Sequence, residues 1–352
     1  MAYTTINKST DYFNTKLYTG NGTAIGSGGN AITGVGHQPD FVWIKDRSAS
    51  NNHNLYDAVR GVQKGLQTSS NGGEYTNTEV LNSFNSDGFT VGDSGGVNTN
   101  SNNYVAWNWK AGTTSIPSSG QSLTPTGMSY NATSGISIIR YDSTDTNPST
   151  IPHGLGVTPE MVIFRNLDDT TNWLVYHKGL SSNKYLYLNS TDAESGSTDY
   201  IDVSSSLITL KTTWTAQNNG SNFMCYAFAP VQGYSKMGTF EGNGTAFPNS
   251  PFIYLGFKPK FFMWKNADDN TDGNDNWNII DSTAQEYNSK DAGYLMANSS
   301  GYNFSGNTIN FLSNGVKIDV ASSYHNQSGD TYIYYAVGQS LVGSNNIPCT
   351  AR

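Results

Sequence analysis

Apolar residues in this chain form short runs that are separated by polar turns rich in Gly, Asn, Ser and Thr. In residues 13–18 the odd positions share one face, which is the period-two pattern of a half-buried strand. Residues 41–44 are all apolar, which predicts a strand that is covered on both faces. Pro39 has no N–H and therefore suits the start of this strand. We expect Lys45 to end the strand in water.

The segment around this strand, which we call the anchor, is written three times, and the repetition organises the prediction for the whole chain. Each copy has a glycine, a proline three residues later, an apolar run, and a basic residue at its end. The copies lie at residues 34–45, 154–165 and 254–265. Aromatic residues recur near the end of the apolar run, and we predict that they fill the cores. These residues are Trp43, Phe164 and Trp264.

Further strand and turn signals surround each anchor. An Asn-Ser-Asp-Gly hairpin signal at 85–88 has a counterpart at 313–315, and apolar runs at 104–109, 223–228 and 332–337 close the copies. Each copy spans about 100 residues, enough for one antiparallel sandwich. We therefore predict an all-β protein of three jelly-roll or concanavalin-like β-sandwiches. The alternative is that two copies share one larger sandwich.

The predicted boundaries follow from the repeats and from a Ser/Thr/Pro-rich stretch between the first two. That stretch is long for a loop inside one domain. The predicted segments are a sandwich at 1–112, a linker at 113–133, a sandwich at 134–232, a sandwich at 233–343 and an extended tail at 344–352.

Composition narrows the class of protein. Of the 352 residues, 13% are charged and 12% are aromatic, which suits strands and turns better than helices or disorder. The net charge of −8 argues against a nucleic-acid partner. An apolar run of 18 residues is absent from the sequence, so we expect no membrane insertion. Residues 1–8 do not have a basic end followed by an apolar core, so we expect no signal peptide. Cys225 and Cys349 are too few for a disulfide framework, and we expect a buried thiol and a tail thiol.

Catalytic chemistry has little support in the sequence. The five histidines are scattered, and the Gly-x-Ser-x-Gly nucleophile signature is absent. The acidic residues lie mostly in turns, so we expect no pair of carboxyl groups facing each other across a cleft, as a glycosidase requires. We therefore predict that the protein is not an enzyme and needs no cofactor, with calcium as the one candidate.

The calcium candidate is a polar insertion in the third copy. Asp268, Asn270 and Asp272 follow the first half of a calcium-loop pattern, although the acidic residue expected at the twelfth position is Ile279. The alternative is a polar hairpin tip. Trp277 follows this insertion and is the tryptophan we expect to be exposed. With Asp275 and Asn276 beside it, it is the candidate carbohydrate-binding group.

Several motifs of the first copy resemble a repeat domain of phage virion proteins. The chain contains Gly-x-x-Pro-Asp-Phe-Val-Trp-Ile-Lys-Asp-Arg at 36–47, Leu-Tyr-Asp-x-Val-Arg-Gly at 55–61, Ser-Asp-Gly-Phe-Thr-Val-Gly at 86–92 and Tyr-Val-Ala-Trp-Asn-Trp-Lys-Ala-Gly at 104–112. The similar domains are common in phages of marine and cyanobacterial hosts and are often labelled concanavalin-like lectin/glucanase sandwiches. The second copy lacks the Gly-Asn-Gly opener, and the third lacks the Val-Arg-Gly step.

The resemblance implies a location and a set of partners, but no catalytic residues. We expect a structural protein on the virion exterior, assembled in the host cytoplasm, as a head decoration or fibre, or as a tail-fibre component. Its partners would be other capsid or tail proteins, with self-association into a homo-oligomer such as a trimer. The alternative function is that of a lectin-like receptor-binding protein that recognises host-surface polysaccharide.

Overall fold

The computed structural model describes residues 4–268, 275–284, 293–302, 304, 306 and 308–342. Antiparallel strands dominate, which confirms the all-β prediction. The helices in this part of the chain are single turns, and none has the length and apolar character to span a bilayer. They are η1 (Ser9–Asp11), η2 (Ile25–Ser27), α1 (Gly95–Asn98) and α2 (Ser323–Asn326).

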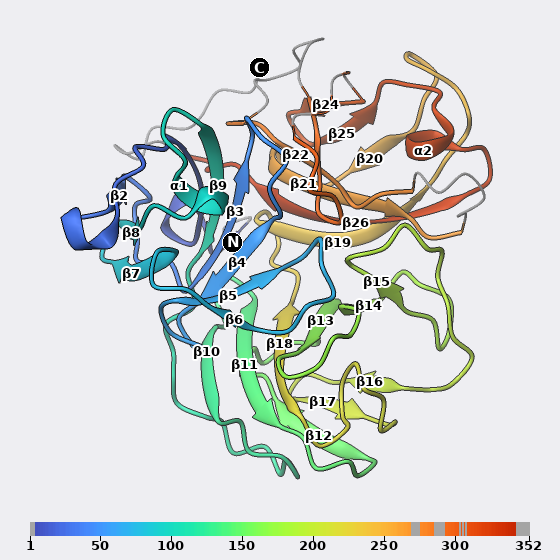
Figure 1. Ribbon diagram of the computed structural model, residues 1–352. Helices are drawn as coiled ribbons and strands as arrows, with labels where there is room; N and C mark the ends of the chain where they lie inside the picture. The colour runs from blue at the N-terminus through green and yellow to red at the C-terminus, as the bar shows by residue number, and fades with distance from the viewer. Residues whose placement is uncertain are drawn as a thin grey trace.

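The first repeat forms a larger and a smaller sheet (Figure 1). Its larger sheet has the order β1 (Phe13–Thr19), β9 (Asn103–Trp109), β3 (Phe41–Asp46), β4 (Asn54–Asp57), β5 (Lys64–Gln67) and β6 (Tyr75–Thr76). Its smaller sheet has the order β2 (Asn30–Thr33), β8 (Gly88–Val91) and β7 (Leu81–Asn85). The anchor strand β3 lies in the interior of the larger sheet.

The second and third repeats have the same plan. The second has β10 (Gly127–Asn131), β11 (Ile136–Asp142), β18 (Asn222–Phe228), β13 (Met161–Asn166), β14 (Leu174–His177) and β15 (Leu186–Tyr187), with β12 (Ser149–Pro152), β17 (Leu207–Leu210) and β16 (Ile201–Val203). The third has β19 (Ser235–Glu241), β26 (Thr331–Gly338), β21 (Pro259–Asn266), β22 (Asn278–Asp281) and β23 (Leu295–Met296), with β20 (Phe252–Tyr254), β25 (Gly315–Ile318) and β24 (Ile309–Leu312).

Each anchor strand contributes to two different cores. Val42 and Ile44 of β3 pack between the larger and smaller sheets of the first repeat. Phe41 and Trp43 point to the opposite face and join a central core, because side chains alternate along a strand. All six residues of β3 are buried, which confirms the prediction for the apolar run at 41–44.

The central core is formed by all three repeats together. Each larger sheet has one face that points away from its own smaller sheet, and these three faces meet in the central core. The first repeat supplies Trp107, the second Ile163 and the third Met263. Figure 1 shows the repeats arranged around this common centre. The void that remains between them is about 10 Å³, which is at the lower limit for holding one water molecule, and its lining is apolar. The three sandwiches are therefore one packed unit.

The predicted core aromatics are buried, as expected, but they do not share one position. Trp43 faces the central core, whereas Phe164 and Trp264 lie in the cores of their own repeats. When the anchors are aligned on their basic residues, Trp43 is one residue out of step with the other two. A shift of one residue moves a side chain to the opposite face of a strand.

Equivalent residues close the contacts between neighbouring repeats, which we call seams. Trp173 precedes β14, and its indole N–H donates to the backbone carbonyl of Gln67 at 3.1 Å. Trp277 precedes β22 and donates in the same way to the carbonyl of Tyr187 at 2.9 Å. The equivalent residue of the first repeat, His53, contacts the backbone at the end of β23. The seams therefore follow a pseudo-threefold pattern.

The basic residues that end the anchor strands also lie in the seams. Lys45, Arg165 and Lys265 are fully buried, so the prediction that Lys45 ends its strand in water is wrong. The strand ends against a neighbouring repeat, and each base donates to backbone carbonyls on both sides of the seam. The acceptors across the seams are Ser300 for Lys45 at 2.8 Å, Asn71 for Arg165 at 2.8 Å and Thr191 for Lys265 at 3.0 Å.

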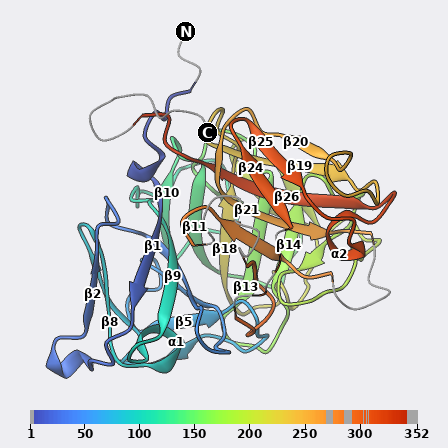
Figure 2. The ribbon, with the colours of Figure 1, turned by 90° about the horizontal axis from the view of Figure 1, so that it is seen from above.

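Two segments near the repeat boundaries are also part of this packing. Residues 127–131 of the expected linker form the edge strand β10, which pairs with β11 in the second repeat. At the third seam, Leu341 donates its N–H to the carbonyl of Asn7 at 2.8 Å. Figure 2 shows the first and last described segments side by side. The first and third repeats are therefore also in contact, and each repeat contacts both of the others.

Candidate functional site

The predicted carbohydrate-binding residues are buried or make hydrogen bonds within the protein. Trp277 has 1% of its surface exposed, so the expectation that it is exposed is wrong. Its ring packs in the central core, because it occupies the same seam position as Trp173. Asp275 is buried, and its carbonyl accepts from Lys265 at 2.7 Å. The side chain of Asn276 accepts from Asn298 at 2.8 Å.

The calcium prediction can be followed for one of its three residues. Asn270 and Asp272 lie outside the described residues. Asp268 is exposed, and its carboxylate accepts from the backbone N–H of Thr331 at 2.7 Å, where β26 begins. Within the described part of the chain, groups of three or more His, Cys, Asp or Glu placed to hold a metal are absent. The calcium site stays a prediction.

The histidines and the described cysteine are buried. Burial lowers the pKa of His177 and of His325 to about 4, so both are neutral at pH 7. His177 accepts from Gly179 N–H through Nδ1 at 3.0 Å and donates to the Tyr334 carbonyl through Nε2 at 3.1 Å. Both ring nitrogens are therefore occupied. Cys225 is a buried free thiol, as expected, and Cys349 lies outside the described residues.

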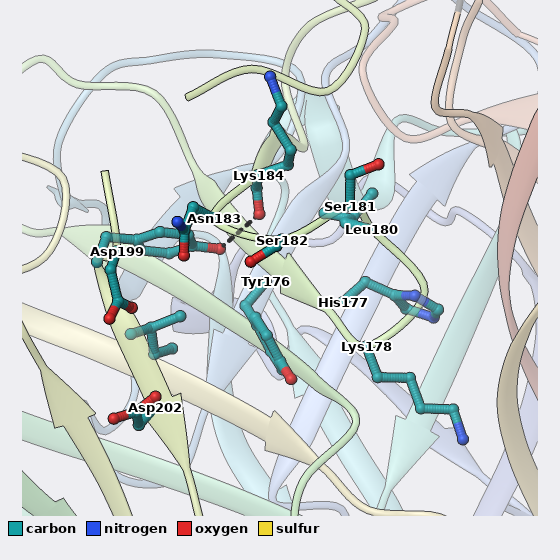
Figure 3. A pocket seen from close by; sticks show the side chains of 12 residues that line it. Tyr176, His177, Lys178, Leu180, Ser181, Ser182, Asn183, Lys184, Asp199 and Asp202 are labelled. Carbon is teal, nitrogen blue, oxygen red and sulfur yellow. Dashed lines mark hydrogen bonds between the residues drawn. The ribbon is translucent and has the colours of Figure 1, made fainter. Parts of the chain in front are cut away.

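An open pocket lies on the outer side of the second repeat, with a volume of about 370 Å³ (Figure 3). Tyr176 of β14 is at its centre, and Asp202 of β16 and Lys178 lie on either side of that ring. The loop at 180–184 forms a third side. The complete lining is Tyr176, His177, Lys178, Leu180, Ser181, Ser182, Asn183, Lys184, Asp199, Tyr200, Ile201 and Asp202.

The first repeat shows why this pocket is open. There the ring of Tyr56, equivalent to Tyr176, is fully buried, and its hydroxyl is 3.1 Å from that of Tyr75. The position equivalent to Tyr75 in the second repeat is Ser195, which is too small to cover the ring. Tyr176 is therefore only partly buried.

A backbone hydrogen bond that closes the corresponding region of the first repeat is also absent from the second. In the first repeat the N–H of Gln63 donates to the carbonyl of Leu81 at 2.8 Å, which joins the loop to β7. The equivalent pair in the second repeat, Asn183 and Ile201, makes no such hydrogen bond, although Asn183 has nearly the same φ of 64° as the 65° of Gln63. The loop and β16 therefore stand apart, and the pocket lies between them.

The charges around the pocket are arranged in pairs. Lys211 donates to Asp199 at 2.7 Å and contacts Asp202 at 2.5 Å. Lys178 donates to Glu160 at 2.6 Å. The carboxylates of Asp199 and Asp202 raise the pKa of Lys211 through these bonds. Burial, together with the charges of Glu160 and Asp202, raises the pKa of Tyr176, so its hydroxyl keeps its proton at neutral pH.

The expectation that no two carboxyl groups share a cleft is wrong in its geometry. Asp199 and Asp202 line the same pocket and both contact one ammonium group, so the two contacting oxygens are at most about 5 Å apart, which is no wider than the carboxyl pair of a retaining glycosidase. Their side chains are, however, 54% and 62% exposed. A general acid needs an environment that favours its protonated form. The ammonium group also stands between the two carboxylates, in the space that a glycosidic bond would need.

The sequence differences that open this pocket can be found by comparing the first two repeats. Tyr56 and Tyr176 occupy equivalent steps of the repeats, while Arg60, which fills the interior of the first repeat, corresponds to Leu180 in the second. The substitution of Tyr75 by Ser195 becomes visible only when the two repeats are aligned through their loops.

Comparison with known proteins identifies a family without an assigned activity. A domain of unknown function, DUF7483, matches residues 8–340, which is nearly the whole chain. The chain therefore belongs to this family. No curated protein and no solved structure gives a significant match.

Proposed function

We propose that this member of the DUF7483 family is a non-enzymatic structural protein on the exterior of a phage particle, as a head decoration or fibre, or as a tail-fibre component. The observation that carries the proposal is the shared central core. Three sandwiches bury their larger sheets against one another and are joined at every seam by hydrogen bonds from buried side chains. Such a block opens few segments to proteases, which suits a particle that persists outside a cell.

The surface composition supports the same proposal. Charged residues make up 13% of the chain, and exposed turns are rich in Asn, Ser and Thr. The motifs at 36–47 and 104–112 resemble a repeat domain of phage virion proteins. Other capsid or tail proteins are the proposed partners. One chain already places three sandwiches around a centre, and self-association of the whole chain is a separate prediction that light scattering of the purified protein tests.

The direct test is the composition of the particle. Mass spectrometry of gradient-purified virions should detect the chain at a fixed copy number, and antibodies against it should label intact particles in electron micrographs. Absence of the chain from purified particles, with abundance in the soluble lysate, would refute the proposal.

A second candidate function is recognition of host-surface glycans. The observation that favours it is the pocket around Tyr176, which is open in the second repeat and closed in the first. A non-enzymatic binding role fits the paired carboxylates, because Lys211 holds both of them.

A further inference from the structure

We propose that the pocket of the second repeat binds a short uncharged saccharide, with the ring of Tyr176 as the stacking surface. This inference rests on the second proposed function, glycan recognition. It moves the predicted sugar site from Trp277, which is buried in a seam, to a side chain that a ligand can reach.

The first step of the argument is the size and shape of the pocket. Its volume of about 370 Å³ is within the range of roughly 300–1,000 Å³ found for small-molecule sites. The side chain of Tyr176 is partly exposed and lies at the centre of the pocket, between Asp202 and Lys178 (Figure 3). The C–H groups of a pyranose ring carry partial positive charge, and an aromatic face attracts such groups.

The second step is the supply of hydrogen-bonding groups around that ring. The hydroxyl of Tyr176 and the side-chain amide of Asn183 make no hydrogen bond to other described residues. Asp202 is held by Lys211 through one oxygen, which leaves acceptor positions on the carboxylate. A saccharide offers hydroxyl groups that both donate and accept, and these positions on the rim would bind them.

The third step is charge. Asp199 and Asp202 contribute two negative charges to the lining, and Lys178 and Lys184 contribute two positive ones. Lys178 and Lys211 are already paired with carboxylates. A lining of zero net charge gives no electrostatic gain to a uronic acid or a phosphate. The balance therefore favours a neutral sugar over an acidic one.

A rival location exists on the smaller sheet of the third repeat. The side chains of Phe252 and Tyr254 are 45% and 59% exposed on the outer face of β20. The ammonium group of Lys236 already lies 5.6 Å from the centre of the Tyr254 ring. Neither described pocket includes these two residues, so this face provides a matched control for the test.

The test uses the purified full chain and isothermal titration against two matched panels. One panel contains neutral gluco-, xylo- and manno-oligosaccharides of two to four units, and the other contains uronic-acid oligomers of the same lengths. We expect a neutral oligosaccharide to bind. Tyr176→Ala should weaken its binding about tenfold or more, Tyr176→Phe should change it by a few-fold only, and Tyr254→Ala should leave it unchanged.

Asp202→Ala is a second pocket variant, and it should also weaken binding without unfolding the protein, because that side chain is 62% exposed. Thermal unfolding of every variant checks the fold. Four results would overturn the inference: tighter binding of the acidic panel, loss of binding in Tyr254→Ala but not in Tyr176→Ala, cleavage of the bound oligosaccharide, or no binding of either panel at millimolar concentration. Virion mass spectrometry tests the structural role separately, so the two failures are distinguishable.

Discussion

Replacing Trp277 with alanine tests whether this residue holds a seam or serves as a surface platform. The side chain is 1% exposed, packs in the central core and donates its indole N–H to the Tyr187 carbonyl at 2.9 Å. Truncation of a buried tryptophan costs about 3–5 kcal/mol through lost burial and the cavity left behind. The carbonyl that loses its donor adds roughly 1 kcal/mol or more. We therefore expect Trp277→Ala to lower the free energy of unfolding by about 4–6 kcal/mol.

The assay is urea unfolding followed by far-ultraviolet circular dichroism and by tryptophan fluorescence. Both signals should change in one transition, because the repeats share the central core. Trp277→Phe should lose less stability than Trp277→Ala, since it keeps most of the ring and lacks only the N–H donor. Tyr254→Ala is the matched control for an exposed aromatic residue, and its effect should be within about 0.5 kcal/mol.

A small effect would refute this reasoning. If Trp277→Ala lost less than about 1 kcal/mol, the ring could not be buried in a packed seam. If the variant also lost glycan binding at unchanged stability, the surface-platform interpretation of Trp277 would be restored. Separate transitions in the two optical signals would show that the sandwiches unfold independently and that the central core does not couple them.

Two further predictions concern buried ionisable groups. Burial lowers the pKa of His177 and His325 to about 4, so between pH 6.5 and 4 the unfolded chain binds more protons than the folded chain. Each histidine should therefore lower the free energy of unfolding by about 2 kcal/mol when the pH falls from 8 to 5. In urea unfolding, the double variant His177→Gln with His325→Gln should show a weaker dependence on pH. Lys265→Met should lower the free energy of unfolding by about 1–3 kcal/mol, because the Thr191 carbonyl loses its donor. The control is Lys8→Met, which removes an exposed ion pair and should lower the free energy of unfolding by less than about 1 kcal/mol. Equal effects of the two substitutions would contradict the role of Lys265 in the seam.

The strands of the repeats could be predicted from local pattern alone. The alternation in residues 13–18 and the apolar run at 41–44 define β1 and β3, because burial of one or both faces leaves a direct trace in the order of side chains. The cores of the individual sandwiches follow from the same traces. The packing partner of the other face of each larger sheet, which lies in the central core, could not be predicted this way. An apolar face indicates that it is covered, but it does not identify the element that covers it.

The seams show what local pattern leaves out. A basic residue after an apolar run normally indicates that the strand has reached water, and this rule failed for Lys45, Arg165 and Lys265. The recurrence of a basic residue at this position in all three copies argued against exposure to water, because an exposed residue has no protein partner that requires a basic side chain. Backbone carbonyls of the next repeat are those partners, and their position depends on the packing of whole sheets.

The location of the pocket follows from what the seams require. A residue such as Trp173 has its acceptor in another repeat, so a change there disturbs two repeats at once. A residue such as Tyr75 covers only its own repeat, and its exchange for Ser195 in the second copy uncovers Tyr176 while leaving the shared core intact. Differences between the copies are therefore tolerated best on the outer side, away from the centre. A ligand site that arose in one repeat alone is expected on that side, where the pocket lies.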